Sequence, residues 1–124
     1  MFNIPAHDAV RLRHMLDAAH KARAFMRNRS RSELESDEML ALAVVRLLEI
    51  LGEAAARVSP AVQAELPNIP WRQIIGTRNR LIHGYFNVDL DIIWTILQHD
   101  LPTCTTELET AIEMLNRDSS SQVT

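Results

Sequence analysis

The sequence predicts an all-α protein, an up-and-down bundle of four to five helices in a single domain. Apolar side chains recur every three or four residues over long stretches, which is the repeat of helices that bury one face. Only three glycines occur among the 124 residues, too few for the many tight turns of an all-β fold. The five prolines lie mainly between the periodic stretches and separate one helix from the next.

The first two helices have the clearest patterns. One repeat predicts a helix over residues 8–28, and a second predicts a helix over residues 40–58. The second repeat alternates steps of four and three, which is typical of a seam packed on a nearly antiparallel neighbour. A polar run separates the two helices, and Ser36 near its end is a candidate N-cap. Ser59-Pro60 is expected to end the second helix.

A third helix is predicted from Trp71 to about His83, with Asn68 as its candidate N-cap. A fourth helix follows, and either Asn87 or Asp89 is placed to cap it. The last apolar stripe continues across Pro102.

Pro102, in the segment Asp100-Leu101-Pro102, either kinks the fourth helix or begins a fifth. Residues 1–116 are expected to form the domain, and the polar residues 117–124 to form a flexible tail. The second and fourth helices are long enough to serve as a dimer face as well as part of the core.

Composition excludes several classes of protein. The longest apolar stretch, residues 39–51, contains Arg46 and Glu49 and is too short to span a bilayer, so no membrane association is expected. The first residues lack the basic and apolar segments of a signal peptide. Cys104 is the only cysteine and has no partner for an intrachain disulfide, which favours a reducing, cytoplasmic location.

Charge is distributed unevenly along the chain. Residues 1–31 hold seven basic side chains against two aspartates, a net charge of +5, while the remaining residues carry −8. Such a segment can face a polyanion or an acidic partner, or it can be a solvated helix face. A contribution of Arg23, Arg27 and Arg29 to RNA or partner binding is therefore a hypothesis at this point.

Arg78 occupies an unusual position in the predicted third helix. At about 100° per residue it falls in the middle of an apolar stripe. An unpaired guanidinium there is costly, so Arg78 requires a carboxylate, a bound anion or a protomer interface. Glu49 and Glu53 on the preceding helix are candidate partners. The stripe consists of Trp71, Ile74, Ile75, Arg78, Ile82 and Tyr85.

The residues around Arg78 suit phosphate chemistry. The guanidinium fork matches two phosphate oxygens, and a histidine such as His83 moves protons near pH 7. Asn79 shares a helix face with His83. This set is poor for metal binding, so no metal and no cofactor are expected. One His83 cannot easily serve as both base and acid, whereas a two-fold dimer supplies two. Ordinary surface or core hydrogen bonds remain an alternative explanation of these residues.

The pattern Arg78-x4-His83-x-Tyr85 resembles the signature of the HepT-like branch of the HEPN superfamily. The likeness covers the chain up to about residue 115, with the helices in the same order. It extends over the flanking segments 12–16, 48–55, 71–86 and 88–94, followed by Asp100-Leu101-Pro102.

This resemblance implies a dimerising all-α toxin, a metal-independent endoribonuclease whose motifs meet in a cleft at the dimer interface. It implies as partner a nucleotidyltransferase antitoxin of the MNT type, which transfers AMP onto Tyr85. Arg78 would hold the scissile phosphate, His83 would be acid or base, and Asn79 would orient the phosphate or His83. Arg80 has no role implied by the family and is a candidate RNA or partner contact, or a solvated side chain.

The same resemblance allows a second function. Some HEPN domains act as non-catalytic, nucleotide-binding partner subunits of a nucleotidyltransferase. In that case Tyr85, Glu49 and Glu53 would matter more than His83. Loss of RNA cleavage on substitution of His83 distinguishes the enzyme from the binding module.

Overall fold

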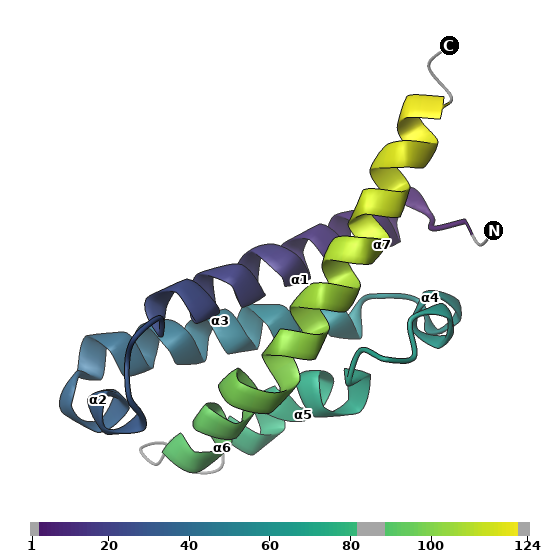
Figure 1. The fold of residues 1–124 in the computed structure, drawn as a ribbon. Coiled ribbons are helices and arrows are strands. Elements are labelled where there is room, and N and C mark those ends of the chain that lie inside the picture. Colours follow the sequence, from purple (N-terminus) through teal and green to yellow (C-terminus); the bar gives the residue numbers. More distant parts are fainter. Residues whose placement is uncertain (1–2, 82–88, 122–124) are drawn as a thin grey trace.

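The computed structural model describes residues 3–81 and 89–121, without the side chains of Arg78 and of residues 118–121. All regular structure in these ranges is helical, which confirms the predicted all-α class (Figure 1). The elements are α1 (Ala6–Phe25), α2 (Arg31–Ser36), α3 (Glu38–Ala56), α4 (Pro60–Glu65), α5 (Trp71–Leu81), α6 (Leu90–Thr95), the π-helical turn η1 (Ile96–Asp100) and α7 (Leu101–Ser121).

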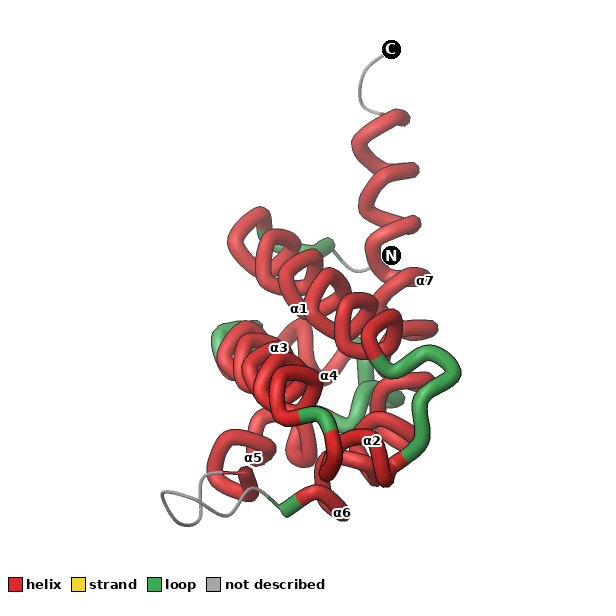
Figure 2. The backbone as a smooth tube through the Cα atoms, turned by 90° about the vertical axis from the view of Figure 1, so that its left-hand side faces the viewer, coloured by secondary structure: helices red, strands yellow, loops and turns green. Residues whose placement is uncertain are grey.

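Four long helical runs form the body of the molecule. Helices α1 and α3 lie side by side and antiparallel, with α5 against α3 and α7 crossing α1 (Figures 1 and 2). Their facing positions are closed to solvent, because each helix turns an apolar face towards its neighbours. The innermost side chains include Leu12 and Met15 of α1, Val44 and Leu48 of α3, and Leu101 and Leu108 of α7.

A buried carboxylate ties the start of α1 to the start of α4. Asp8 is fully buried, and its two oxygens accept hydrogen bonds of 2.8 Å from the backbone N–H and the hydroxyl of Ser59. The Ser59 hydroxyl also caps α4 by accepting from the backbone N–H of Val62 at 3.4 Å. A buried charge is tolerated when it is hydrogen-bonded in this way, and the pair fixes where the chain leaves α3.

Several predicted boundaries require correction. Asp37, not Ser36, caps α3, because Ser36 belongs to the short helix α2. Asn68 does not cap α5: its amide lies 3.5 Å from a Glu107 carboxylate oxygen, and the carbonyl of Pro70 accepts the first helical bond. The sequence does not predict the six-residue helices α2 and α4, since fewer than two turns are too short to show a periodic pattern. Of the two candidate caps of α6, Asp89 accepts from two backbone N–H groups.

Pro102 does not break the last helical run. Residues 90–121 are continuously helical, and the turn before the proline widens into the π-helical η1, in which the backbone N–H of Leu101 bonds the carbonyl of Ile96. The wider turn accommodates a residue that has no N–H and whose ring would collide with the preceding turn. Helix α7 continues to Ser121, so the backbone of residues 117–121 is helical.

Gly52 sets the distance between α3 and α5. A Cβ atom at this buried position would lie 2.9 Å from the backbone carbonyl oxygen of Ile74, closer than side chains approach backbone. The two helices therefore touch backbone to backbone at this point. A Cβ atom added to Gly76, on α5 itself, would have no neighbour within 4 Å, so Gly76 sets no such limit.

We expect Gly52→Ala to destabilise the protein by about 1–3 kcal/mol, because the added methyl must push α5 away from α3. Gly76→Ala is the matched control, and it should be neutral or stabilise by up to about 1 kcal/mol, since alanine favours a helix interior. Urea unfolding followed by circular dichroism measures both. If Gly52→Ala were as stable as the unsubstituted protein, α3 and α5 could accommodate a methyl group at this contact.

Candidate functional site

Helix α5 carries the start of the predicted motif, and its N-terminal end is firmly anchored. The indole N–H of Trp71 donates to the carbonyl of Leu66 at 2.9 Å, and the backbone N–H of Ile74 donates to the carbonyl of Pro70 at 3.0 Å. Trp71 is thus part of the scaffold, as its apolar pattern predicted. The tight start of α5 and the Gly52 contact together fix the direction in which the helix approaches the motif.

The buried face of α5 differs from the predicted stripe. The buried residues of α5 are Ile74, Thr77 and Leu81. The buried Thr77 hydroxyl has a hydrogen-bond partner, because it donates to the carbonyl of Gln73 at 2.8 Å. On a helical wheel this row lies to one side of the predicted stripe, so position 78 is at the edge of the buried face and not at its centre. The side chain of Arg78 is outside the described part of the chain.

Asn79 and Arg80 are exposed. Arg80 approaches the π-helical turn: burial raises the pKa of the Asp100 carboxyl above its ordinary value, while the charges of Arg80 and His99 act to lower it. The effect of burial on the pKa of Asp100 is larger than that of the two positive charges. The Asp100 carboxyl is thus close enough to Arg80 for the arginine's charge to affect its pKa, a proximity that the sequence did not suggest.

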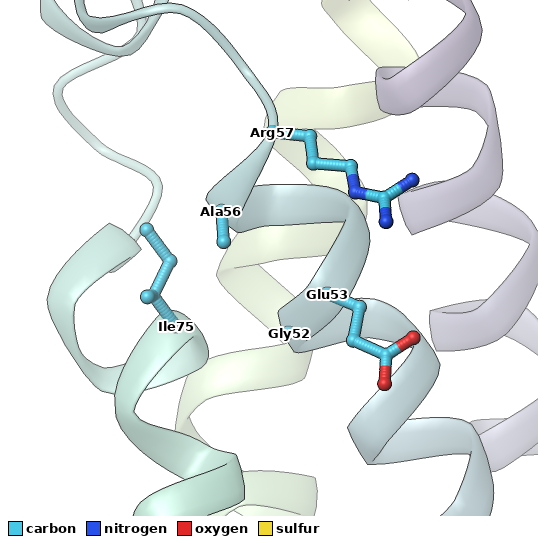
Figure 3. A pocket seen from close by; sticks show the side chains of 5 residues that line it. All are labelled: Gly52, Glu53, Ala56, Arg57 and Ile75. Atoms are coloured by element: carbon cyan, nitrogen blue, oxygen red, sulfur yellow. The ribbon is translucent and has the colours of Figure 1, made fainter.

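The acidic candidates on α3 occupy different surroundings. Glu49 is half-buried and pairs with Arg46 at 3.3 Å, so it is engaged within its own helix. Glu53 is exposed and stands beside Arg57, one turn further on (Figure 3). Glu53 and Arg57 line an open groove of about 340 Å³ between α3 and α5, bounded on the α5 side by Ile75.

A second, smaller groove adjoins the first. It lies between α1 and α3, measures about 110 Å³, and shares Glu53 and Arg57 with the first groove. On the α1 side it is lined by Arg11 and His14. The Glu53–Arg57 turn of α3 is therefore a ridge with a groove on either flank. Arg57 is a groove residue that the sequence analysis did not single out, because the groove depends on how α1 and α5 pack against α3.

The direction of α5 places its end relative to α3. The helices run antiparallel from the Gly52–Ile74 contact (Figure 1), so at about 1.5 Å per residue Leu81 lies beside the first half of α3. We call the end of the bundle where α5 ends at Leu81 and α6 begins at Leu90 the motif end. His83 and Tyr85 belong to the segment between these helices and lie outside the described residues, so their predicted roles stay predictions.

Other reactive groups do not add to this site. Cys104 is fully buried, and burial together with the charge of Asp100 raises its pKa to about 12, which keeps the thiol protonated near neutral pH. In the described ranges no three side chains among His, Cys, Asp and Glu are grouped closely enough to hold a metal ion. Nor is any helix in those ranges long and apolar enough to cross a membrane.

The fold and the Arg78–Tyr85 pattern together point to one family. The profile of the family described as Ribonuclease HepT-like matches residues 15–113, which include α3, α5 and the whole motif. The chain therefore belongs to the HepT-like ribonuclease family, as its resemblance to that group predicted.

Named relatives agree with this assignment. A Methanocaldococcus jannaschii protein provisionally named as an RNase is 35% identical over 95 residues, covering 77% of this chain and 87% of the relative. A Caldanaerobacter subterraneus protein, also provisionally named as an RNase, is 37% identical over 83 residues, 66% of this chain and 70% of its own. A Thermococcus cleftensis protein named a probable ribonuclease HepT is 39% identical over 67 residues, 54% of this chain and 61% of its own. No solved structure gave a significant match.

Proposed function

We propose that this chain is a metal-independent endoribonuclease and the toxin of a HEPN/MNT toxin–antitoxin pair. The observation that carries the proposal is the family match over residues 15–113, which contains Arg78-x4-His83-x-Tyr85 without a departure from the pattern. The names of these relatives, each of which is a ribonuclease name, support RNA as the substrate.

In the proposed reaction the RNA supplies its own nucleophile. A base removes the proton from a 2′-hydroxyl, and the 2′-oxygen attacks the adjacent phosphorus. The bond to the 5′-oxygen breaks, an acid protonates that oxygen, and the products are a 2′,3′-cyclic phosphate and a 5′-hydroxyl. Arg78 balances the charge that develops on the phosphate, and His83 acts as base or acid. Asn79 orients the phosphate or His83, and Arg80 is a candidate second phosphate contact.

The reaction needs two proton-transfer groups, which we propose are supplied by two copies of the chain. The outer face of α3 supports this, because Met39 and Leu42 are 82% and 59% exposed. Large apolar side chains exposed on one face of one helix are typical of an interaction surface. They lie in the first half of α3, at the motif end, so a two-fold contact there would bring the two motifs near each other.

We further propose that the antitoxin silences the site by modifying Tyr85. The tyrosine oxygen attacks the α-phosphorus of ATP, the bond to the leaving pyrophosphate breaks, and AMP remains on the ring. Each AMP adds a bulky phosphodiester with a negative charge beside groups that bind phosphate. RNA is then excluded both by charge repulsion and by volume.

The first expected result concerns His83. In excess chelator the unmodified protein should cut labelled RNA and leave cyclic-phosphate ends, whereas His83→Ala should lose about 100-fold or more of the activity. His7→Ala is the control, since His7 is a 71%-exposed histidine at the start of α1. Product ends are identified by their response to phosphatase before and after acid opening of the cyclic phosphate.

Either of two outcomes would count against this proposal. Cleavage that survives His83→Ala would remove His83 from the chemistry. An absence of cleavage, by protein whose mass shows no modification, would favour the alternative of a non-catalytic partner subunit of a nucleotidyltransferase.

The dimer face predicts a specific defect. Met39→Glu with Leu42→Glu should raise the dimer dissociation constant by about tenfold or more, at least about 1.4 kcal/mol, because carboxylates would be buried in the interface. Met114→Glu, at a 38%-exposed position of α7, is the control. Sedimentation velocity over a range of concentrations measures both. A monomeric parent protein, or a double variant that dimerises like the parent, would disprove the α3 interface.

The modification site predicts a change of mass. With the partner nucleotidyltransferase and ATP, the protein should gain one or more AMP groups and lose its ribonuclease activity. Tyr85→Phe should gain none, because phenylalanine has no hydroxyl to accept the group. Intact-mass spectrometry decides the question, and an AMP gain that persists in Tyr85→Phe would place the acceptor elsewhere.

A further inference from the structure

The arginines of the basic segment at residues 1–31 differ in whether they form ion pairs with carboxylates. Arg29 pairs with Glu33 at 3.3 Å and Asp37 at 3.6 Å, so its charge is largely offset. Arg31 likewise has carboxylate partners. Arg23, in the last turn of α1, and Arg27, in the turn that follows it, have no carboxylate partner among the described residues. The positive charge near this end of the segment therefore comes mainly from Arg23 and Arg27 and less from Arg29 and Arg31.

Arg23 and Arg27 line an open groove of about 640 Å³ at the C-terminal end of α1. The groove is bounded by His20, Arg23 and Ala24 of α1 and by Arg27 in the turn that follows the helix. The two arginines therefore present two positive charges to the same groove. A carboxylate at this edge, that of Glu109 on α7, is already engaged by His20 at 2.8 Å.

Arg23 is held in place by a neutral partner. Its Nη1 donates to the Thr105 hydroxyl at 2.8 Å, and that nearly buried hydroxyl donates its own proton to the carbonyl of Pro102 at 3.0 Å. Thr105 therefore orients the guanidinium without cancelling its charge. The remaining N–H groups of Arg23 stay available to a ligand, and a pre-positioned fork of this kind suits a phosphate.

The lining favours a polyanion over a protein partner. Protein interfaces concentrate their binding energy in buried aromatic and apolar centres, whereas Ala24 is the only apolar residue among the described ones that bound this groove. The groove is also near the motif end. Arg31, the first residue of α2 and four positions after Arg27, contacts Asp91 at 2.6 Å in the first turn of α6, the helix that follows the motif segment.

We infer that the α1 groove, lined by His20, Arg23 and Arg27, binds the phosphodiester backbone of a single RNA strand beyond the scissile bond. This inference rests on the proposed ribonuclease function and adds a substrate-binding site to it. Arg23 and Arg27 contact phosphate and not bases, so they contribute affinity that is independent of sequence and sensitive to salt.

The test measures RNA binding without cleavage. In the His83→Ala background, fluorescence anisotropy of a labelled single-stranded RNA is recorded at several salt concentrations. The double variant Arg23→Gln with Arg27→Gln should bind about tenfold or more weakly, and its log–log salt slope should fall by about one for each arginine removed. Arg117→Gln, an exposed arginine paired with Glu113 towards the far end of α7, is the control and should leave both quantities unchanged.

A conservative variant separates a charge effect from a folding effect. Arg23→Lys with Arg27→Lys keeps both charges and should keep the salt slope. An Arg23→Gln, Arg27→Gln protein that binds RNA like the control would overturn the inference. So would a double variant that binds RNA normally but no longer binds the nucleotidyltransferase, because the groove would then face an acidic protein.

Cleavage by the same variants distinguishes this inference from the proposed function. In protein with His83 intact, Arg23→Gln with Arg27→Gln should raise KM and leave kcat nearly unchanged, because the groove lies away from the reacting bond. If the parent protein binds RNA with the expected arginine dependence but never cuts it, the groove stands and the nuclease proposal fails. If the parent cuts RNA but the salt slope is the same with and without the two arginines, the nuclease proposal stands and the groove proposal fails.

Discussion

The contact between Gly52 and the backbone of Ile74 is the constraint on which the rest of this structure depends. Helix α5 packs mainly on α3, and its N-terminal half is fixed by a backbone-to-backbone approach to α3 that no side chain permits. Close packing makes such a contact stiff, so a shift of α5 relative to α3 at this point would move the whole of α5. Residue 78 lies about one turn beyond Ile74, and the direction in which the motif leaves the bundle is set at Gly52.

The remaining helices hold this contact in register. The α1–α3 pair supplies most of the core, and the buried Asp8 carboxylate fixes the turn from α3 into α4 through its two bonds to Ser59. The chain then returns to α3 as α5. On the other side, the π-helical turn lets α6 and α7 form one run despite Pro102 and places Asp100 near Arg80. The motif segment is thus flanked by the end of α5 and the start of α6, and different contacts fix the positions of these two helix ends.

Helices with a long apolar repeat could be predicted from the sequence, whereas features that depend on tertiary contact could not. The extents of α1, α3 and α5 followed from periodicity within a few residues. Helices α2 and α4 did not, and neither did the π-helical turn, because the consequence of Pro102 depends on what surrounds the helix. A glycine in a helical pattern signals a close approach, but only the structure shows that Gly52 meets α5 and that Gly76 meets nothing.

The candidate site shows the same division. Residue types and spacing singled out Arg78, Asn79 and His83, and the resemblance to the family added a role for Tyr85; these roles stay predictions. The charge count of the first 31 residues could not show which arginines carry the net potential, because the carboxylates that pair with Arg29 and Arg31 lie beyond residue 31, in α2, at the N-cap of α3 and in α6. In the proposed function, Arg78 holds the scissile phosphate while the groove at the end of α1 supplies affinity for the rest of the strand. The second proton-transfer group of that proposal is His83 of a second copy of the chain.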